Sequence, residues 1–139
     1  MREILFRGKR RDNLEWMEGC FLIDYITGQY FIHAQGNSVN ESDGVGEEGC
    51  VSFQAFEVFP DTVCQYTGLT DRNGEKIFEG DIVKCGGNLV VTWNEKFAGW
   101  CLTKKGWAYK HFFGEACEPK DCEVIGNIFD NLGLIGGAG

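Results

Sequence analysis

The stretch that most constrains the fold runs from residue 63 to residue 83. Its first half is rich in β-branched and aromatic residues, which fit a pleated, half-buried surface. Asn73 and Gly74 then interrupt the run, and both tolerate positive φ, so the pair is a strong signal for a hairpin turn. Apolar residues resume, and Gly80 and Asp81 form a second tight turn before Ile82. The stretch therefore predicts a hairpin followed by a third strand.

Composition supports the same fold class over the rest of the chain. The 139 residues include 20 glycines and only 2 prolines, which favours short strands joined by tight turns. No window of 12 residues keeps apolar positions at helical spacing with a cap at each end. We expect a mainly β protein with little helix. Residues 1–59 would form an N-terminal antiparallel sheet packed on a small SH3-like barrel half at 60–131, followed by a glycine-rich tail at 132–139.

The N-terminal half predicts a meander of short strands. Gly19 is expected to separate one strand that starts near Leu14 from another at 20–25. Residues 89–93 are the clearest buried strand, and Gly86-Gly87-Asn88 is the predicted turn before it. Residues 107–113 fit either a strand or one helical turn.

Residues 34–50 differ in character from their neighbours. They are polar, acidic and glycine-rich, so they cannot bury enough apolar surface to offset their ordering entropy. We expect a mobile surface loop. Its acidic spacing does not match an EF-hand, so it predicts no metal site.

The net charge of −8 argues against binding of duplex DNA, because phosphate contacts need a basic surface. The charge is uneven, since residues 1–11 hold five basic side chains and one acidic one. We interpret these as solvated charges at strand ends and turns; a local basic arm is the alternative.

The seven cysteines are an odd number with scattered spacing. With no signal peptide and no membrane span, we expect the cytoplasm, where thiols stay reduced, and we interpret most of the cysteines as small buried hydrophobes. Cys117 and Cys122, with His111 upstream, are a possible Zn²⁺ site. Paired Cys-x2-Cys spacings are lacking, so two partly buried thiols are the favoured interpretation and no metal or cofactor is expected.

Catalytic groups are not selected by any motif. His33 could act as a base for Cys50 or Cys64, and several carboxylates could form an acid–base pair, but Asp71 and Asp81 are better explained as turn residues that bind backbone N–H groups. Nucleotide-binding glycine loops are absent from the sequence. An enzyme is therefore the least favoured class.

Aromatic residues gather in the last third of the chain, where lysines interleave with them. Trp93, Trp100 and Trp107, with Lys104 and Lys105, are the candidate contacts for single-stranded nucleic acid or a partner protein. The competing interpretation is that these rings fill a small core or mark a subunit interface.

Three segments resemble the YopX family, small proteins of phages and prophages with no established activity. The middle one spans 60–83 and includes Gln65-Tyr66-Thr67-Gly68-Leu69 and Glu79-Gly80-Asp81-Ile82-Val83. The others are Arg2 to Lys9 and Val124 to Asn131. Cys64 stands where the family usually has glycine. The resemblance implies a phage or prophage protein, in the bacterial host cytoplasm, with no demonstrated activity. We expect a protein-interaction or assembly module that forms a homo-oligomer; the alternative is a small β-barrel that binds single-stranded nucleic acid.

Overall fold

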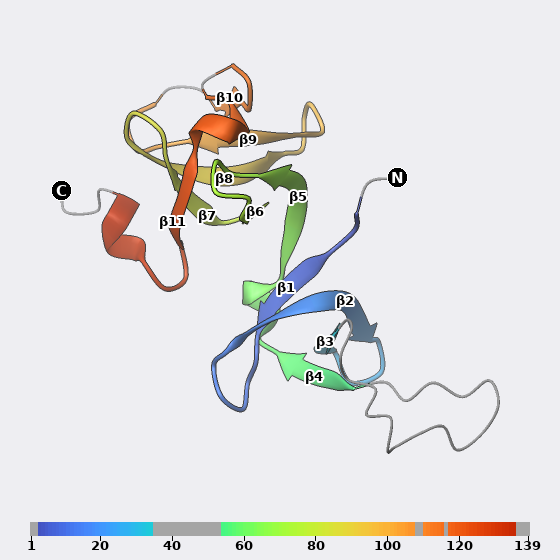
Figure 1. Cartoon of the computed structure of the whole chain (residues 1–139). Coiled ribbons are helices and arrows are strands. Elements are labelled where there is room, and N and C mark those ends of the chain that lie inside the picture. Colours follow the sequence, from blue (N-terminus) through green and yellow to red (C-terminus); the bar gives the residue numbers. More distant parts are fainter. Residues whose placement is uncertain (1–2, 35–53, 108–109, 116, 136–139) are drawn as a thin grey trace. The chain divides into compact units, whose positions relative to one another are not determined.

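Short antiparallel strands joined by tight turns make up most of the computed structural model (Figure 1). It describes residues 3–34, 54–107, 110–115 and 117–135. Within these ranges the only helical elements are 3-10 turns, η2 (Pro60–Thr62), η3 (Pro119–Asp121) and η4 (Leu132–Ile135). The predicted mainly β class with little helix is confirmed. None of the described helices is long and apolar enough to cross a membrane.

The chain divides into two compact units, an N-terminal unit of Glu3–Gln65 and a C-terminal unit that begins at Tyr66. The boundary between the units lies within one strand, β5 (Cys64–Thr70). The boundary expected from the sequence lies after residue 59. Cys64 and Gln65 pair with the first strand, and Tyr66 pairs with Phe78 in the other unit.

The N-terminal unit is an antiparallel sheet in the order β4-β3-β2-β1, with the start of β5 beside β1. Its strands are β1 (Phe6–Lys9), β2 (Trp16–Asp24), β3 (Gln29–Ala34) and β4 (Ala55–Val58). Side chains on one face form its core, because residues two apart in a strand point the same way. The ring of Phe21 lies between Phe6 and Tyr30, at centroid distances of 5.5 and 5.1 Å, and Ile32 and Val58 are fully buried.

The prediction that Gly19 breaks the second strand is wrong. β2 continues through this residue, which pairs with Phe6 on one side and Ala34 on the other. Pairing with two neighbours fixes the backbone of Gly19 in an extended conformation, and this outweighs the weak strand preference of glycine.

The C-terminal unit contains a five-stranded antiparallel sheet in the order β10-β9-β8-β7-β11, and β5 pairs with β6 beside it. The strands are β6 (Lys76–Phe78), β7 (Asp81–Lys84), β8 (Asn88–Asn94), β9 (Gly99–Thr103), β10 (His111–Phe112) and β11 (Glu123–Asn127). Among the described strands this sheet does not close: β10 and β11 are its edges, and β10 is only two residues long. The expected SH3-like barrel is therefore an open sheet.

The turns predicted from glycine and asparagine are confirmed. Gly74, with φ +80°, closes the β5–β6 hairpin, and Gly86 and Gly87 lie at positive φ between β7 and β8. Residues 107–113 include β10, so the strand alternative holds for His111 and Phe112.

The core of the C-terminal unit lies on one face of its sheet. Its buried aliphatic members are Ile77, Val83, Leu89, Val91 and Leu102, and Cys117 and Cys122 are buried beside them. Beyond the last strand, the Leu134 carbonyl accepts a hydrogen bond of 2.7 Å from the Asn88 side chain, which holds η4 against β8. The predicted acidic loop, except for Ala34 at the end of β3, lies outside the described residues.

Candidate functional site

The predicted tryptophan and lysine side chains belong to the C-terminal unit, but they differ in exposure. Trp93 on β8 and Trp100 on β9 are opposite each other, with ring centroids 4.9 Å apart. Trp93 is 38% exposed, while Trp100 packs against the core. Trp107 also packs against the core, and Lys104 Nζ lies 5.7 Å from the centre of its ring. Two of the three rings are therefore partly used for packing.

Lys104 and Lys105 also border an apolar hollow in the same unit. It has a volume of about 520 Å³ and is lined by Val90, Ile128 and Leu132. Lysine stems commonly cover apolar surface while their ammonium groups stay in water. Both lysines thus border this hollow, and Lys104 also lies over the ring of Trp107.

A second group of basic and aromatic side chains lies in the N-terminal unit, and it was not among the predicted contacts. Arg7 and Lys9 lie over Trp16, at 4.8 and 5.6 Å from the ring centre. Arg10 lies 4.1 Å from the centre of Phe56. The basic residues at 7–11 are evident in the sequence, but the aromatic rings of Trp16 and Phe56 belong to other strands, β2 and β4. The basic side chains interpreted as solvated charges thus also stack on rings, as cation–π pairs do.

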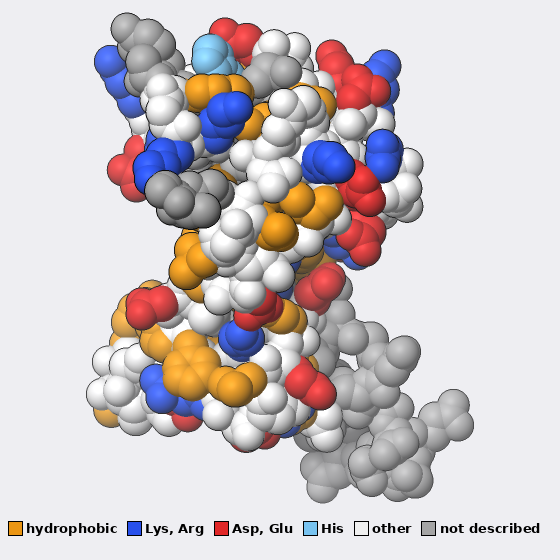
Figure 2. Space-filling view, turned by 90° about the vertical axis from the view of Figure 1, so that its left-hand side faces the viewer, with side chains coloured by type: hydrophobic (Ala, Val, Ile, Leu, Met, Phe, Trp, Pro, Cys, Tyr) orange, Lys and Arg blue, Asp and Glu red, His pale blue; other side chains and the backbone are white. Residues whose placement is uncertain are grey.

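The most exposed large apolar side chains lie at the tip of the β2–β3 hairpin. Tyr25 is 89% exposed and Ile26 is 96% exposed. The tip is held by Asp24, whose Oδ1 accepts hydrogen bonds from Ile26 N at 2.9 Å and Thr27 N at 3.3 Å. Figure 2 shows one face of the molecule, on which hydrophobic side chains are exposed among charged ones. An ordered turn thus presents two apolar side chains to water.

Asp71 organises the β5–β6 hairpin, as the sequence indicated, and it has a further partner. Its Oδ1 accepts hydrogen bonds from Asn73 N and Glu75 N at 2.8 and 2.9 Å, and its Oδ2 accepts one from Val124 N at 2.9 Å. Burial acts to raise the pKa of Asp71, but these N–H donors, with Arg72 nearby, hold it below the ordinary value of 3.8. Asp81 is also buried, and its Oδ2 accepts a hydrogen bond from Phe78 N at 2.8 Å.

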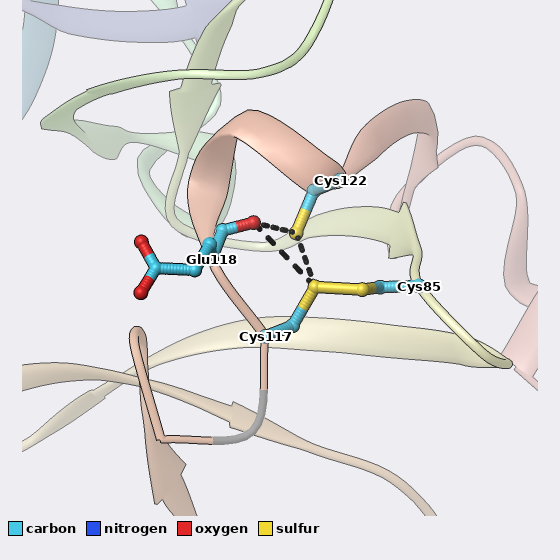
Figure 3. The surroundings of a disulfide bond; sticks show 4 residues. All are labelled: Cys85, Cys117, Glu118 and Cys122. Carbon is cyan, nitrogen blue, oxygen red and sulfur yellow. Dashed lines mark hydrogen bonds between the residues drawn. A yellow bond between two sulfur atoms is a disulfide. The ribbon is translucent and has the colours of Figure 1, made fainter.

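The cysteines depart from the expectation of reduced, separate thiols. Cys85 and Cys117 form a disulfide, and Cys122 Sγ lies 3.2 Å from Cys117 Sγ (Figure 3). Cys122 is fully buried; burial first, and then Asp121 and Asp71, raise the pKa of its thiol to about 11. The spacing of 32 residues between Cys85 and Cys117 gives no signal in sequence, because the fold alone brings them together.

The other cysteine and histidine residues suggested by the sequence as site residues have different partners in the structure. His111 Nδ1 lies 3.7 Å from a Glu115 carboxylate oxygen, and the cluster of three cysteines contains Cys85 in its place. The thiol of Cys64 is buried and donates a hydrogen bond to the Thr62 carbonyl at 3.2 Å. His33 pairs across the sheet with Cys20, and Cys50 lies outside the described residues.

Comparison with known proteins agrees with the resemblance seen in sequence. The model of a family described as YopX protein matches residues 5–136, which is nearly the whole chain. A search of the curated proteins finds no match.

Proposed function

This chain belongs to the YopX family, and from that membership and its surface we propose that it is a non-enzymatic protein-interaction or assembly module. In this proposal it is encoded by a phage or prophage, acts in the host cytoplasm and associates with itself. The observation that carries the proposal is the β2–β3 hairpin tip, where Tyr25 and Ile26 are almost fully exposed.

The energetic argument rests on how interfaces are built. Large apolar and aromatic side chains that enter a partner's pocket supply most of the binding energy of many interfaces. The Asp24 carboxylate holds the backbone of the turn at Ile26 and Thr27, so less backbone entropy has to be lost when the tip binds. The polar side chains of Asp24, Thr27 and Gln29 at the turn would contribute to the polar rim that such contacts usually have.

Light scattering coupled to size-exclusion chromatography at micromolar concentration tests the proposal. We expect the wild-type chain to be an oligomer and the double variant Tyr25→Ser, Ile26→Ser to be a monomer with unchanged circular dichroism. Phe97→Ser is the matched control, because Phe97 is also an exposed ring, at 63%, and should leave the oligomer intact. A strictly monomeric wild-type chain would contradict self-association.

A second candidate, binding of single-stranded nucleic acid, is favoured by the exposed ring of Trp93 and by Lys104 and Lys105 in the same C-terminal unit. Bases stack on exposed aromatic rings, and lysines attract the phosphates. It is weaker because Trp100 and Trp107 pack against the core. Fluorescence anisotropy with an oligothymidine should show binding that weakens with salt and with Trp93→Ala. Absence of binding at low salt removes this candidate.

A further inference from the structure

Three cysteine sulfurs from separate parts of the chain meet at one edge of the C-terminal core. The Sγ atoms of Cys85, Cys117 and Cys122 all lie within 4.8 Å of one another. Figure 3 shows them pointing toward one another, one from the turn after β7 and two from the chain on either side of η3. The cluster uses three of the seven cysteines and is unrelated to the hairpin tip of the proposed interface.

Local structure explains why two of the sulfurs are adjacent. Cys117 and Cys122 flank the single 3-10 turn η3, which begins at Pro119 and is closed by a hydrogen bond of 3.0 Å from Cys122 N to the Pro119 carbonyl. The fixed φ of proline suits the first position of such a turn. Four intervening residues are within the range that separates paired zinc ligands.

The third sulfur comes from the β7–β8 hairpin. Cys85 follows β7 directly, and its N–H donates a hydrogen bond of 2.9 Å to the Gly87 carbonyl. Gly86 and Gly87 both have positive φ, which lets the chain reverse tightly beside the sulfur. Cys85 is half-buried, while Cys117 and Cys122 are buried in the core. One side of the cluster is therefore open to small molecules and ions.

We propose that the reduced chain binds one Zn²⁺ ion through Cys85, Cys117 and Cys122. Tetrahedral Zn–S bonds of about 2.3 Å place thiolate sulfurs about 3.8 Å apart. The sulfurs of Cys117 and Cys122 are 3.2 Å apart and all three lie within 4.8 Å of one another, so reduction of the Cys85–Cys117 disulfide needs only a local separation of two sulfurs to reach this geometry. The apolar side chains of Val83, Leu89 and Leu102 in the same core would limit access of water, which strengthens metal–thiolate contacts. Among the described residues no other histidine, cysteine or carboxylate atom joins the group, and the Glu118 carboxylate points away from it. Water therefore takes the fourth position.

The disulfide and the metal exclude each other. A dithiol reductant supplies two electrons and two protons to the Cys85–Cys117 bond and itself becomes a cyclic disulfide. The three free thiols then release three protons as Zn²⁺ binds the three thiolates. The disulfide form retains one thiol in the cluster, and one thiolate is too few ligands to hold zinc tightly.

Elemental analysis of reduced protein, after equilibration with Zn²⁺ and removal of loosely bound metal, tests the proposal. We expect about one equivalent of Zn²⁺ in the reduced wild-type chain and at least a tenfold lower affinity in Cys85→Ser and Cys122→Ser. Cys20→Ser, which removes an exposed cysteine outside the cluster, is the matched control and should bind as the wild type does. Co²⁺ in place of Zn²⁺ should give sulfur-to-metal charge-transfer absorption.

A second measurement avoids the risk that a variant misfolds. In the wild-type chain, bound Zn²⁺ should slow alkylation of Cys85, Cys117 and Cys122 at least tenfold, as followed by peptide mass spectrometry, and leave Cys20 unchanged. The proposal is overturned if the reduced wild type retains less than a tenth of an equivalent. It is equally overturned if the disulfide form binds as much Zn²⁺ as the reduced form, or if alkylation of the three cysteines is unaffected.

Discussion

Replacement of Asp71 by alanine is the sharpest test of how the C-terminal unit is held together. The change leaves three backbone N–H groups without their acceptor, those of Asn73, Glu75 and Val124. A buried donor that loses its partner costs about 1–3 kcal/mol. Asn73 and Glu75 are exposed, so water can replace the carboxylate there, whereas Val124 is half-buried in β11. We expect a total loss of about 2–4 kcal/mol in the free energy of unfolding.

Asp24→Ala is the matched control. The Asp24 carboxylate also accepts hydrogen bonds within a hairpin turn, but the two residues whose backbone N–H groups donate to it, Ile26 and Thr27, are exposed. Unlike Asp71, the Asp24 side chain makes no hydrogen bond to a further strand among the described residues. Its removal should cost only about 0.5–1 kcal/mol. Urea denaturation followed by tryptophan fluorescence would measure both losses, since Trp93, Trp100 and Trp107 lie in the unit that contains Asp71 and Trp16 lies in the unit that contains Asp24. Losses that agree within about 0.5 kcal/mol would refute the role given to the Val124 hydrogen bond.

The pH dependence provides an independent test of the same contact. The folded state holds the pKa of Asp71 below the ordinary value of 3.8, so its ionised form stabilises the fold. The stability difference between the wild type and Asp71→Ala should be complete above pH 3.8. It should shrink as the pH falls through the lower folded pKa, because the carboxylate is then protonated in both states. A difference that grows on acidification would contradict this sign.

Three further predictions concern packing and the disulfide. Gly99→Ala should lower the free energy of unfolding by about 1–3 kcal/mol in urea denaturation, because the new Cβ would lie 2.5 Å from a ring atom of Phe112. Gly133→Ala is the control, because its Cβ would meet nothing within 4 Å and should have little effect. Equal effects of the two variants would contradict the Phe112 contact. Ile77→Ala should cost about 2–5 kcal/mol and Ile4→Ala within about 0.5 kcal/mol in the same assay, since the first side chain is fully buried and the second is 65% exposed; a reversed order would refute the burial argument. Relative to the oxidised wild type, Cys85→Ser should lower the free energy of unfolding by about 3–4 kcal/mol, which is the loop entropy for a separation of 32 residues. In reductant without metal, the variant and the wild type should be equally stable. A loss that persists in reductant would show that packing of the sulfur is responsible.

Sequence reasoning succeeded where the determinants are local. The Asn73-Gly74 and Gly86-Gly87 turns follow from the conformational freedom of those residues, and the existence of β8 follows from a run of apolar β-formers, although only its alternate residues Leu89 and Val91 are buried. It failed at Gly19, because whether a glycine interrupts a strand depends on which strands pair with it. Local signals also could not decide whether the C-terminal sheet closes into a barrel.

Among the site residues, too, local roles were predictable from the sequence and contacts between distant segments were not. The turn role of Asp71 was predictable from its position before Asn73 and Gly74, but its bond to Val124 joins residues 53 apart. The convergence of Cys85 with Cys117 and Cys122 likewise requires the whole sheet. The exposure of Tyr25 and Ile26 was hidden because apolar residues at the end of a strand are usually expected to be buried.

The bond between Asp71 and Val124 also affects the order in which the newly made chain can fold. A ribosome adds about 5–20 residues each second, so the 53 residues that follow Asp71, up to and including Val124, take roughly 3–10 s to synthesise. During that interval the nascent hairpin lacks its neighbour β11, and β7 presents an unpaired edge on which chaperones or a second nascent chain could act. Slow codons within this window should therefore change the yield of native protein more than slow codons placed after residue 124.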